Sequence, residues 1–246
     1  MTHKTKGIVL RSIKYGETSL VVTIFTELFG VQTYMINGVR SSKNAGMKAA
    51  LYQPSAILEM EVYHNELKSM QRIKESTWAT LYTNIFSNVI KNSIALYMVE
   101  LVFKSLKQPE QNADLFYFCE DAFLQLDVAD NHIAANIPLY FALHLAYFFG
   151  FKISNELQNT GGHLYLDLVE GNFTNEQPVH PHFLQGENAL ITSEILKIMQ
   201  LHELGQVMLN SAKRRELLLK YHDYYALHIQ DFGRMKTLDV LHEVLS

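Results

Sequence analysis

Cysteine is almost absent from this chain of 246 residues, which contains Cys119 alone. One thiol closes no intramolecular disulfide and gives at most one thiolate to a metal, so a disulfide-stapled secreted fold and a cysteine-based zinc site are excluded. The N-terminus lacks the apolar core of a signal peptide, and the most apolar stretch, Ile137 to Phe151, carries His144 and is too short to span a bilayer. We therefore expect a cytoplasmic protein that does not meet a membrane.

The chain also lacks the motifs of the common enzyme classes. It has no Gly-x-x-x-x-Gly-Lys-Ser/Thr loop, no Gly-x-Gly-x-x-Gly, no Gly-x-Ser-x-Gly and no His-Glu-x-x-His. Without them, nothing predicts a phosphate cradle, a nucleophile elbow or a zinc-protease centre. We predict that the protein is not an enzyme and has neither catalytic residues nor a cofactor.

One group of residues leaves an enzymatic alternative open. His163, Asp167, His180 and His182 fall in a loop-like segment, and His-x-His is a known spacing of metal ligands. The same spacing also recurs without metal in proline-containing loops like this one, and a chain with eleven histidines is expected to contain some close pairs. We predict no metal site and keep a metal-dependent hydrolase using these four residues as an alternative.

Charge is distributed unevenly along the chain. Residues 1–80 hold ten Lys and Arg against six Asp and Glu, a balance of +4, and residues 81–246 hold eleven against nineteen, a balance of -8. The run from Leu28 to Leu58 contains no acidic residue at all. A basic first part in an otherwise acidic chain favours contact between that part and a polyanion.

The first eighty residues are predicted to be a β-domain. Five strand-like runs are separated by turn residues, namely 7–11, 19–26, 31–39, 56–63 and 67–78. In the fourth run, Leu58, Met60 and Val62 alternate with polar residues, the period of a half-buried strand. Five strands in about 75 residues predict a small closed barrel, with the OB-fold as first candidate and an SH3-like barrel as second.

After Trp78 the apolar residues recur every three or four positions, which is typical of helices. We expect helices over residues 81–106, 115–126, 136–149, 192–204, 213–232 and 238–245. Asn136 ahead of Pro138 predicts the start of an apolar core helix, and Gly150 its end. The predicted fold class is therefore α+β multidomain: an OB-fold β-barrel in 1–80, then an α-helical domain in 81–246 in which 151–190 form a small irregular segment.

The barrel supplies the candidates for binding nucleic acid, with a solvated surface and core tyrosines as the alternative. OB-folds use the end of strand 1 and the loop after it, and a connection of about 14 residues between later strands is long enough to be functional. The candidates in these places are Arg11, Lys14, Tyr15, Arg40, Lys43 and Lys48, with Arg72 and Lys74 as secondary ones and Tyr34 and Tyr52 as possible stacking faces. Cations that neutralise phosphates, beside aromatic rings that stack on bases, bind single strands without sequence preference.

The last long helix supplies candidates for binding a protein partner. Lys213, Arg214 and Arg215 open it, at the end where the helix dipole favours anions, so an anionic partner would relieve the cost. The partner-binding candidates are Arg214, Arg215, Tyr221 and Tyr225. The alternative is that the tyrosines are core residues and the cations are solvated.

Several short segments of the chain occur in an order and at a spacing that are typical of one known family. Over about the first 65 residues they are Gly7-Ile8-Val9-Leu10-Arg11, Tyr15-Gly16-Glu17, Val21-Val22, Gly38-Val39-Arg40 and Gln53-Pro54; later come Phe149-Gly150-Phe151 and Arg215-Glu216-Leu217-Leu218. This order and spacing resemble the RecO family of bacterial recombination mediators. The resemblance implies an OB-fold joined to a helical domain that binds single- and double-stranded DNA and anneals complementary strands.

The same resemblance implies partners. Members of the RecO family work with RecR and with the C-terminal tail of single-stranded-DNA-binding protein, and thereby help load RecA indirectly. Many members also carry a four-cysteine zinc module, whereas this chain has no cysteine between Phe151 and Phe183. The resemblance therefore implies a zinc-free variant held by packing of residues such as Leu164, Leu166 and Leu168. A protein-only adaptor whose barrel never touches DNA is the remaining alternative.

Overall fold

The computed structural model describes residues 2–39, 45–108, 110–155 and 164–245. The chain forms two compact units, one of Met1–Asn84 with Val102–Leu124 and the other of Ile85–Leu101 with Gln125–Ser246. Two helices, α2 (Val89–Ser105) and α3 (Ala113–Val128), contribute residues to both units. The assignment of separate roles to residues 1–80 and 81–246 stays a prediction.

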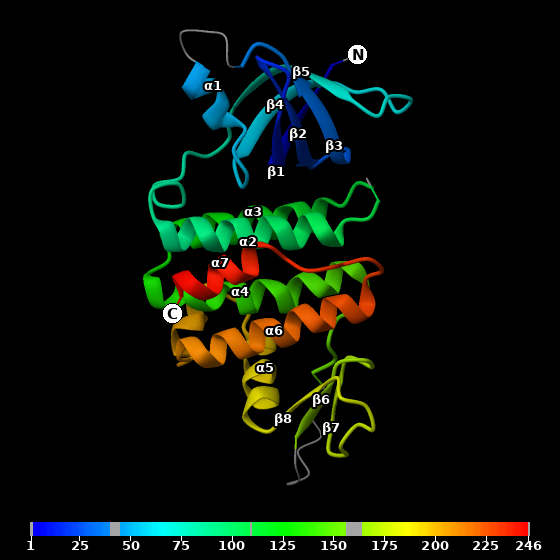
Figure 1. The fold of residues 1–246 in the computed structure, drawn as a ribbon, viewed down its shortest axis with the longest axis vertical. Helices are drawn as coiled ribbons and strands as arrows, with labels where there is room; N and C mark the ends of the chain where they lie inside the picture. Colours follow the sequence, from blue (N-terminus) through cyan, green and yellow to red (C-terminus); the bar gives the residue numbers. More distant parts are fainter. Residues whose placement is uncertain (1, 40–44, 109, 156–163, 246) are drawn as a thin grey trace. The chain divides into compact units, whose positions relative to one another are not determined.

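The first unit contains a closed five-stranded barrel (Figure 1). Its elements are β1 (Thr2–Tyr15), β2 (Ser19–Thr26), β3 (Gly30–Ile36), α1 (Ala45–Leu51), β4 (Ile57–Tyr63) and β5 (Gln71–Trp78). The strand order is β1-β2-β3-β5-β4, and β1 closes the barrel by pairing with both β2 and β4. The predicted five-stranded, OB-like barrel is confirmed. The β3–β5 pair is parallel and joins only Tyr34 to Gln71 and Met35 to Arg72.

Side-chain size and alternation explain the barrel. Leu58, Met60 and Val62 of β4 point into the core and are buried, as their two-residue period predicts. Gly7 of β1 permits the close approach of neighbouring strands, because a Cβ there would lie 2.5 Å from side-chain atoms of Ile24 and Met60. The short helix α1 is a correction to the sequence analysis, which treated its residues as part of a loop.

Residues 102–124 complete the first unit. Phe116 of α3 packs against Phe25 of β2, with ring centroids 5.7 Å apart. The ammonium of Lys6 donates to a carboxylate oxygen of Glu120 at 2.8 Å, and this hydrogen bond raises the pKa of Lys6. The barrel thus carries an attached helical segment rather than ending at its last strand.

The second unit is helical. Besides parts of α2 and α3 it contains α4 (Asn131–Leu145), η1 (Ala146–Phe149), β6 (Tyr165–Asp167), β7 (Asn172–Thr174), β8 (Phe183–Gln185), α5 (Glu187–Lys197), η2 (Leu201–Gln206), α6 (Ser211–His228) and α7 (Thr237–Val244). Helix α4 is buried nearly all round and packs against α5, α6 and η2. Leu218 of α6 and Phe232, which follows this helix, are both buried.

The start of α4 is a correction. The helix begins five residues before Asn136, at a cap where the Asp130 carboxylate accepts from the backbone N–H of Ile133 at 2.8 Å. Pro138 lies inside the helix, and the Asn136 amide instead donates to the carbonyls of Leu204 and Val207. Gly150, with a φ of 82°, ends the helical segment as predicted.

Two other helices start elsewhere than predicted. Helix α2 begins at Val89 rather than at Leu81, because Asn88 caps it by accepting from the backbone N–H of Lys91 at 3.1 Å. The segment predicted as one helix over 192–204 is divided between α5 and the short helix η2. Local capping residues, rather than the apolar period, set these boundaries.

The helical segment Asn131–Phe149 is long and apolar enough to cross a membrane by length and composition, so the prediction that this stretch is too short is corrected. However, 67% of its most apolar window is buried inside the structure. A buried apolar helix of this kind is the core helix of a folded unit.

A small three-stranded sheet, ordered β7-β6-β8, occupies the segment predicted to be irregular. Leu166, Leu168 and Leu184 are buried beneath it, whereas Leu164 is half-buried. Apolar packing therefore supports this segment, as the sequence analysis expected for a chain without the zinc-binding cysteines.

Candidate nucleic-acid interface

The outer surface of the barrel gathers several predicted residues. Directly opposed residues on neighbouring strands point to the same side of a sheet. Arg11 lies opposite Thr23, and Thr23 lies opposite Thr33. In the next outward row Ile13 lies opposite Val21, Val21 opposite Met35, and Met35 beside Arg72. We call this outward surface the barrel face: Arg11, Ile13, Tyr15, Val21, Thr23, Thr33, Met35 and Arg72.

The barrel face contains no acidic residue. Arg11, Tyr15 and Arg72 are exposed, and the two arginines form no ion pair within the described part of the chain. Exposed guanidinium groups without carboxylate neighbours are available to phosphates, and apolar neighbours such as Ile13 and Met35 offer contact to bases. The arrangement is electrostatically suited to a polyanion.

A groove of about 590 Å³ borders the barrel face. We call it the basic groove; its lining is Met35, Ile36, Asn37, Val39, Lys48, Leu51, Tyr52, Arg72, Ile73, Lys74, Glu75 and Ser76. It brings together Lys48 of α1 with Arg72 and Lys74 of β5, three candidates far apart in the sequence. Lys74 is partly committed, because its ammonium donates to Glu61 at 2.8 Å; this hydrogen bond raises the pKa of Lys74 and lowers that of Glu61.

The turn between β1 and β2 adjoins the basic groove. Tyr15 pairs with Ser19, and the Ser19 hydroxyl lies 3.3 Å from the amide oxygen of Asn37, which lines the groove. Lys14 is exposed, but it lies opposite the buried Leu20 and alternates with Ile13 and Tyr15, so it points away from the barrel face. Arg11, Tyr15, Lys48 and Arg72 therefore belong to one continuous surface, which does not include Lys14.

Four other predicted residues do not contribute to this surface in the part of the chain that the structure describes. Arg40 and Lys43 lie outside the described residues. The prediction that Tyr34 and Tyr52 offer stacking faces is wrong, because Tyr34 is fully buried inside the barrel and Tyr52, although it lines the basic groove, is only 6% exposed; burial raises the pKa of each phenol. The sequence analysis also missed Ile13 and Met35, whose outward positions follow only from the strand register.

A second candidate site lies in the helical unit, between the start of α6 and the end of α7. This pocket of about 430 Å³, the partner pocket, is lined by Ser211, Ala212, Arg214, Arg215, Glu216, Leu218, Leu219, His242 and Leu245. The Arg214 guanidinium donates through Nη1 to the Leu209 carbonyl at 2.6 Å, and burial lowers its pKa. Its Nε is buried and has no hydrogen-bond partner among the described residues.

His242 is a pocket residue that the sequence analysis missed. Its Nε2 is likewise buried without a partner in the described part of the chain. Burial lowers the pKa of His242, and the nearby charge of Arg215 lowers it further. Two unpaired polar atoms beside leucine side chains suit a ligand that is anionic at one point and apolar at another.

The predicted tyrosines do not belong to this pocket. Tyr221 and Tyr225 are each 1% exposed, so the prediction that they contact a partner is corrected in favour of the core alternative. Their hydroxyls are satisfied internally, Tyr221 with the Thr192 hydroxyl at 2.8 Å and Tyr225 with the Ala142 carbonyl at 2.7 Å. Lys213 forms ion pairs with Glu187 of α5 and Glu216 of α6 and does not line the pocket.

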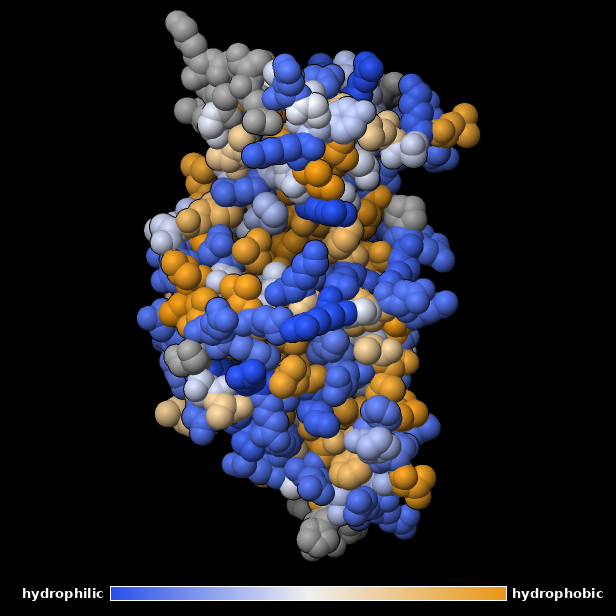
Figure 2. Space-filling view, in the orientation of Figure 1, coloured by the Kyte–Doolittle hydropathy of each residue, from blue (hydrophilic) through white to orange (hydrophobic). Residues whose placement is uncertain are grey.

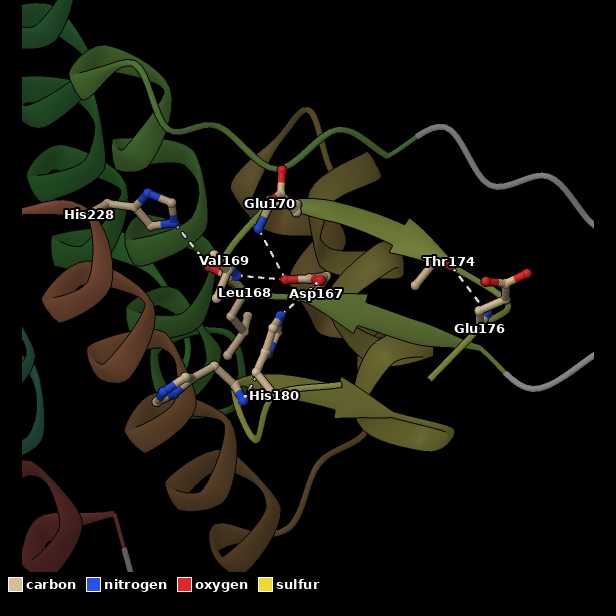
Figure 3. Close-up of polar contacts among 9 residues, drawn as sticks. Asp167, Leu168, Val169, Glu170, Thr174, Glu176, His180 and His228 are labelled. Carbon is tan, nitrogen blue, oxygen red and sulfur yellow. Dashed lines mark hydrogen bonds and ion pairs between the residues drawn. The ribbon is translucent and has the colours of Figure 1, made fainter. Parts of the chain in front are cut away.

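Figure 3 shows the surroundings of Asp167, the centre of the alternative metal site. One carboxylate oxygen accepts from the backbone N–H groups of Val169 and Glu170 at 2.7 and 3.0 Å, and the other lies 3.1 Å from Nε2 of His180. Close by, His228 Nε2 lies 2.9 Å from the Leu168 carbonyl. The Asp167 carboxylate thus closes a turn after β6 and holds the loop that carries His180.

The described ranges contain no group of three or more His, Cys, Asp or Glu side chains placed to hold a metal. His180 and His182 have ring centroids 6.1 Å apart, and the ring Nδ1 of His180 accepts from the backbone N–H of His182. His163, the fourth residue of the alternative, lies outside the described residues. Within these limits the four-residue constellation is not assembled.

A closed barrel with a basic outer face, joined to a helical unit, defines an OB-fold-containing multidomain protein. The family described as Recombination protein O N terminal matches residues 1–82, and Recombination protein O C terminal matches residues 87–156. Proteins named DNA repair protein RecO are similar over the whole length: 32% identical in Bacteroides fragilis, covering 99% of each chain, and 33% identical in Flavobacterium psychrophilum, covering 100% of each. The chain belongs to the RecO family of DNA repair proteins. Such a protein is a recombination mediator and not a catalytic enzyme.

Proposed function

We propose that this RecO-family protein binds single- and double-stranded DNA through the barrel face and the basic groove, and anneals complementary strands there. It would act in the cytoplasm together with RecR to help load RecA on single-stranded DNA covered by single-stranded-DNA-binding protein. The observation that carries the proposal is the acid-free barrel face, continuous with a groove in which Lys48, Arg72 and Lys74 meet.

The mechanism needs no reacting group. Two phosphate backbones repel each other, and cations that neutralise them and release their counterions lower the cost of bringing complementary strands together. Sequence is then read by base pairing itself, while Arg11 and Arg72 contact phosphates and the apolar side chains between them contact bases. The absence of a nucleophile or base from the proposed mechanism agrees with a mediator role.

Fluorescence anisotropy with a labelled single strand across a salt series tests this proposal. Arg72→Ala should weaken binding to all sequences and reduce the slope of log K against log salt by about 0.7, the effect of one lost single-strand contact. Glu61→Gln should act in the opposite direction, because it releases Lys74 from its ion pair. An absence of wild-type binding, or equal slopes for all three proteins, would contradict the proposal.

We further propose that the partner pocket receives the acidic, apolar C-terminal tail of single-stranded-DNA-binding protein. A terminal carboxylate would accept from Arg214 Nε and from His242, while apolar side chains of the tail would pack on Leu218 and Leu245. Arginine and apolar contacts combined in one pocket are typical anchors of peptide recognition.

A labelled tail peptide titrated against wild type and Arg215→Ala tests the pocket. Arg215 is exposed, so its removal should weaken binding without disturbing the fold, and Lys197→Ala is a matched control outside the pocket. Retained affinity in Arg215→Ala and in Leu219→Ser would move the tail elsewhere.

A further inference from the structure

The loop between β4 and β5 displays an apolar side chain to solvent. This loop, residues 64–70, is here called the hairpin tip, and Figure 1 shows it projecting from the side of the barrel. Leu67 at the tip is 96% exposed and Met70 is 39% exposed. In Figure 2 an apolar group stands at the end of this projection. Leu67 contributes little apolar burial to the fold, and single exposed leucines are common on protein surfaces, so the setting of this side chain decides what it can contact.

The hairpin tip is built to hold that side chain in place. The amide of Gln71, itself only 3% exposed, donates to the carbonyls of Asn65 and Lys68 at 2.9 and 2.7 Å and accepts from the backbone N–H of Asn65 at 3.0 Å. The Asn65 side chain accepts from the backbone N–H of Leu67 at 2.9 Å, closing an Asx turn. Leu67 is therefore presented on an ordered turn tied down by one buried amide.

A second groove, of about 640 Å³, separates the hairpin tip from β3. We call it the tip groove, and it is lined by Leu28, Phe29, Val31, Gln32, Thr33, His64, Glu66, Leu67, Lys68, Ser69, Gln71 and Gln111. Thr33 belongs to the barrel face, two residues from Met35 of the basic groove. Gln71 precedes Arg72, which lines the basic groove. The two grooves therefore flank one strip of β3.

We propose that Leu67 is a wedge that enters the base stack of a single strand bound on the barrel face, so that the displaced base occupies the tip groove. Apolar side chains that enter base steps are a known means of unstacking nucleic acid. The groove offers hydroxyl and amide groups from Thr33, Gln32 and Ser69 for the edge of a base, and Lys68 for the adjoining phosphate. A base removed from its stack exposes its pairing edge to a complementary strand.

Nucleic acid is the occupant that the surroundings favour. The tip groove is continuous with the acid-free barrel face through Thr33, and the basic groove begins at Arg72, directly after the buried Gln71. A strand held by Arg72 and Arg11 would thus pass the hairpin tip. The inference rests on the proposed DNA binding of the barrel.

The test uses the full chain and a single-stranded adenine-rich oligonucleotide carrying one 2-aminopurine, whose fluorescence rises when the base is unstacked. Wild type should raise the fluorescence on binding. Leu67→Ser should bind the same strand within about twofold, with an unchanged salt slope, yet lose the fluorescence rise. Gln71→Ala, which releases the turn, should reduce the rise in part. Leu81→Ser, at another leucine of the first unit that is 74% exposed, is the matched control and should behave as wild type.

The outcomes separate the two proposals. If wild type fails to bind the oligonucleotide, the proposed DNA binding fails and the wedge with it. If wild type and Leu67→Ser both bind and both raise the fluorescence equally, DNA binding stands and the wedge is overturned. If Leu67→Ser keeps the fluorescence rise but sediments as a smaller species than wild type, the wedge is overturned and the leucine is assigned to a protein contact.

Discussion

The two units of this protein use their cations differently. On the barrel face Arg11 and Arg72 are exposed and form no ion pair within the described residues. In the helical unit Lys213 pairs with Glu187 and Glu216, and Arg234 pairs with Asp239. The two arginines of the barrel face are thus available to a partner, whereas Lys213 and Arg234 of the helical unit are engaged within the chain.

Composition explains this difference. The balance of +4 in residues 1–80 leaves more cations than carboxylates, whereas the balance of -8 in residues 81–246 leaves more carboxylates than cations. We therefore expect removal of a charged side chain to change ligand binding in the barrel, and to change mainly the free energy of unfolding in the helical unit. The partner pocket is the exception, because the buried Nε of Arg214 has no hydrogen-bond partner there among the residues that the structure describes.

The largest effect is expected from removing three barrel cations at once. Arg11→Ala/Lys48→Ala/Arg72→Ala should flatten the slope of log K against log salt by about 2 and lower affinity at low salt by roughly two orders of magnitude or more. Anisotropy with labelled single strands measures both. The control is Lys197→Ala/Lys220→Ala/Lys236→Ala in the helical unit. An equal loss of DNA affinity in this variant would show that the cations of the two units do not differ in their contribution to binding.

Removing a carboxylate that stabilises the fold should change the stability of the protein and leave DNA binding unchanged. The Glu100 carboxylate accepts from the backbone N–H groups of Lys236 and Thr237 at 3.0 and 2.8 Å and from the Thr237 hydroxyl at 2.6 Å, so it caps helix α7. Glu100→Ala should lower the free energy of unfolding by about 2 kcal/mol, measured by urea denaturation, because it leaves a helix N-terminus uncapped. DNA binding should not change; a loss of binding with intact stability would contradict the comparison.

A buried histidine makes the stability of the helical unit depend on pH. Burial lowers the pKa of His144 below its ordinary value of 6.5, and its ring stacks on Tyr140. The folded state then binds fewer protons than the unfolded state, so this stabilisation is complete above about pH 6.5 and is lost as the pH falls from there through the folded pKa. Thermal unfolding followed from about pH 7.5 down to 5.5 should show a falling midpoint. His144→Gln should flatten the dependence, and the exposed His202→Gln should not.

Surface ion pairs of the helical unit should matter less. The Lys213 ammonium lies 3.2 Å from Glu187 and 3.3 Å from Glu216, with both acids solvent-exposed. Lys213→Ala should lower the free energy of unfolding by only about 0.5 kcal/mol, since water screens these pairs. A loss several times larger in urea denaturation would show that this network is structural.

The smallest effect is expected from a chelator. The small sheet of β6, β7 and β8 is supported by Leu166, Leu168 and Leu184 and by the Asp167 turn. We predict that EDTA leaves the melting temperature unchanged, whereas a structural zinc site would make folding depend on metal. A clear fall with EDTA, together with zinc recovered from the purified protein, would restore the histidine alternative.

Structural features that depend only on neighbouring residues in the sequence were predictable. Alternation of Leu58, Met60 and Val62 fixes the inner side of β4 without any knowledge of neighbours. The early residues of β1 were missed because Thr2 to Lys6 lack the apolar period of a buried strand, although pairing with β4 makes them one. The residues of helix α1 were predicted to be a loop because they lie between two strand-like runs, although Ala49, Ala50 and Leu51 favour a helix.

The candidate sites depend on contacts that no local pattern contains. Arg72 and Lys48 are 24 positions apart, and only the barrel closure and the placement of α1 bring them to one groove. His242 joins Arg214 in the partner pocket because α7 packs near the start of α6. Tyr221 and Tyr225 have the same amphipathic character whether a helix faces solvent or core, so their burial was decided by tertiary packing.

The barrel is closed by a seam of two residue pairs between β3 and β5, and one of those pairs, Met35 with Arg72, lies on the barrel face. A ligand that contacts both strands at that point stabilises the closed barrel. It would lose one of its two binding strands when β3 and β5 separate on unfolding. Under the DNA binding proposed above, binding and folding are linked by mass action, and the unfolding free energy of the barrel should rise by RT ln(1 + [L]/Kd) as free DNA is added. Amide hydrogen exchange along β3 and β5 should slow in proportion, so that the shortest pairing in the barrel reports the occupancy of its outer surface.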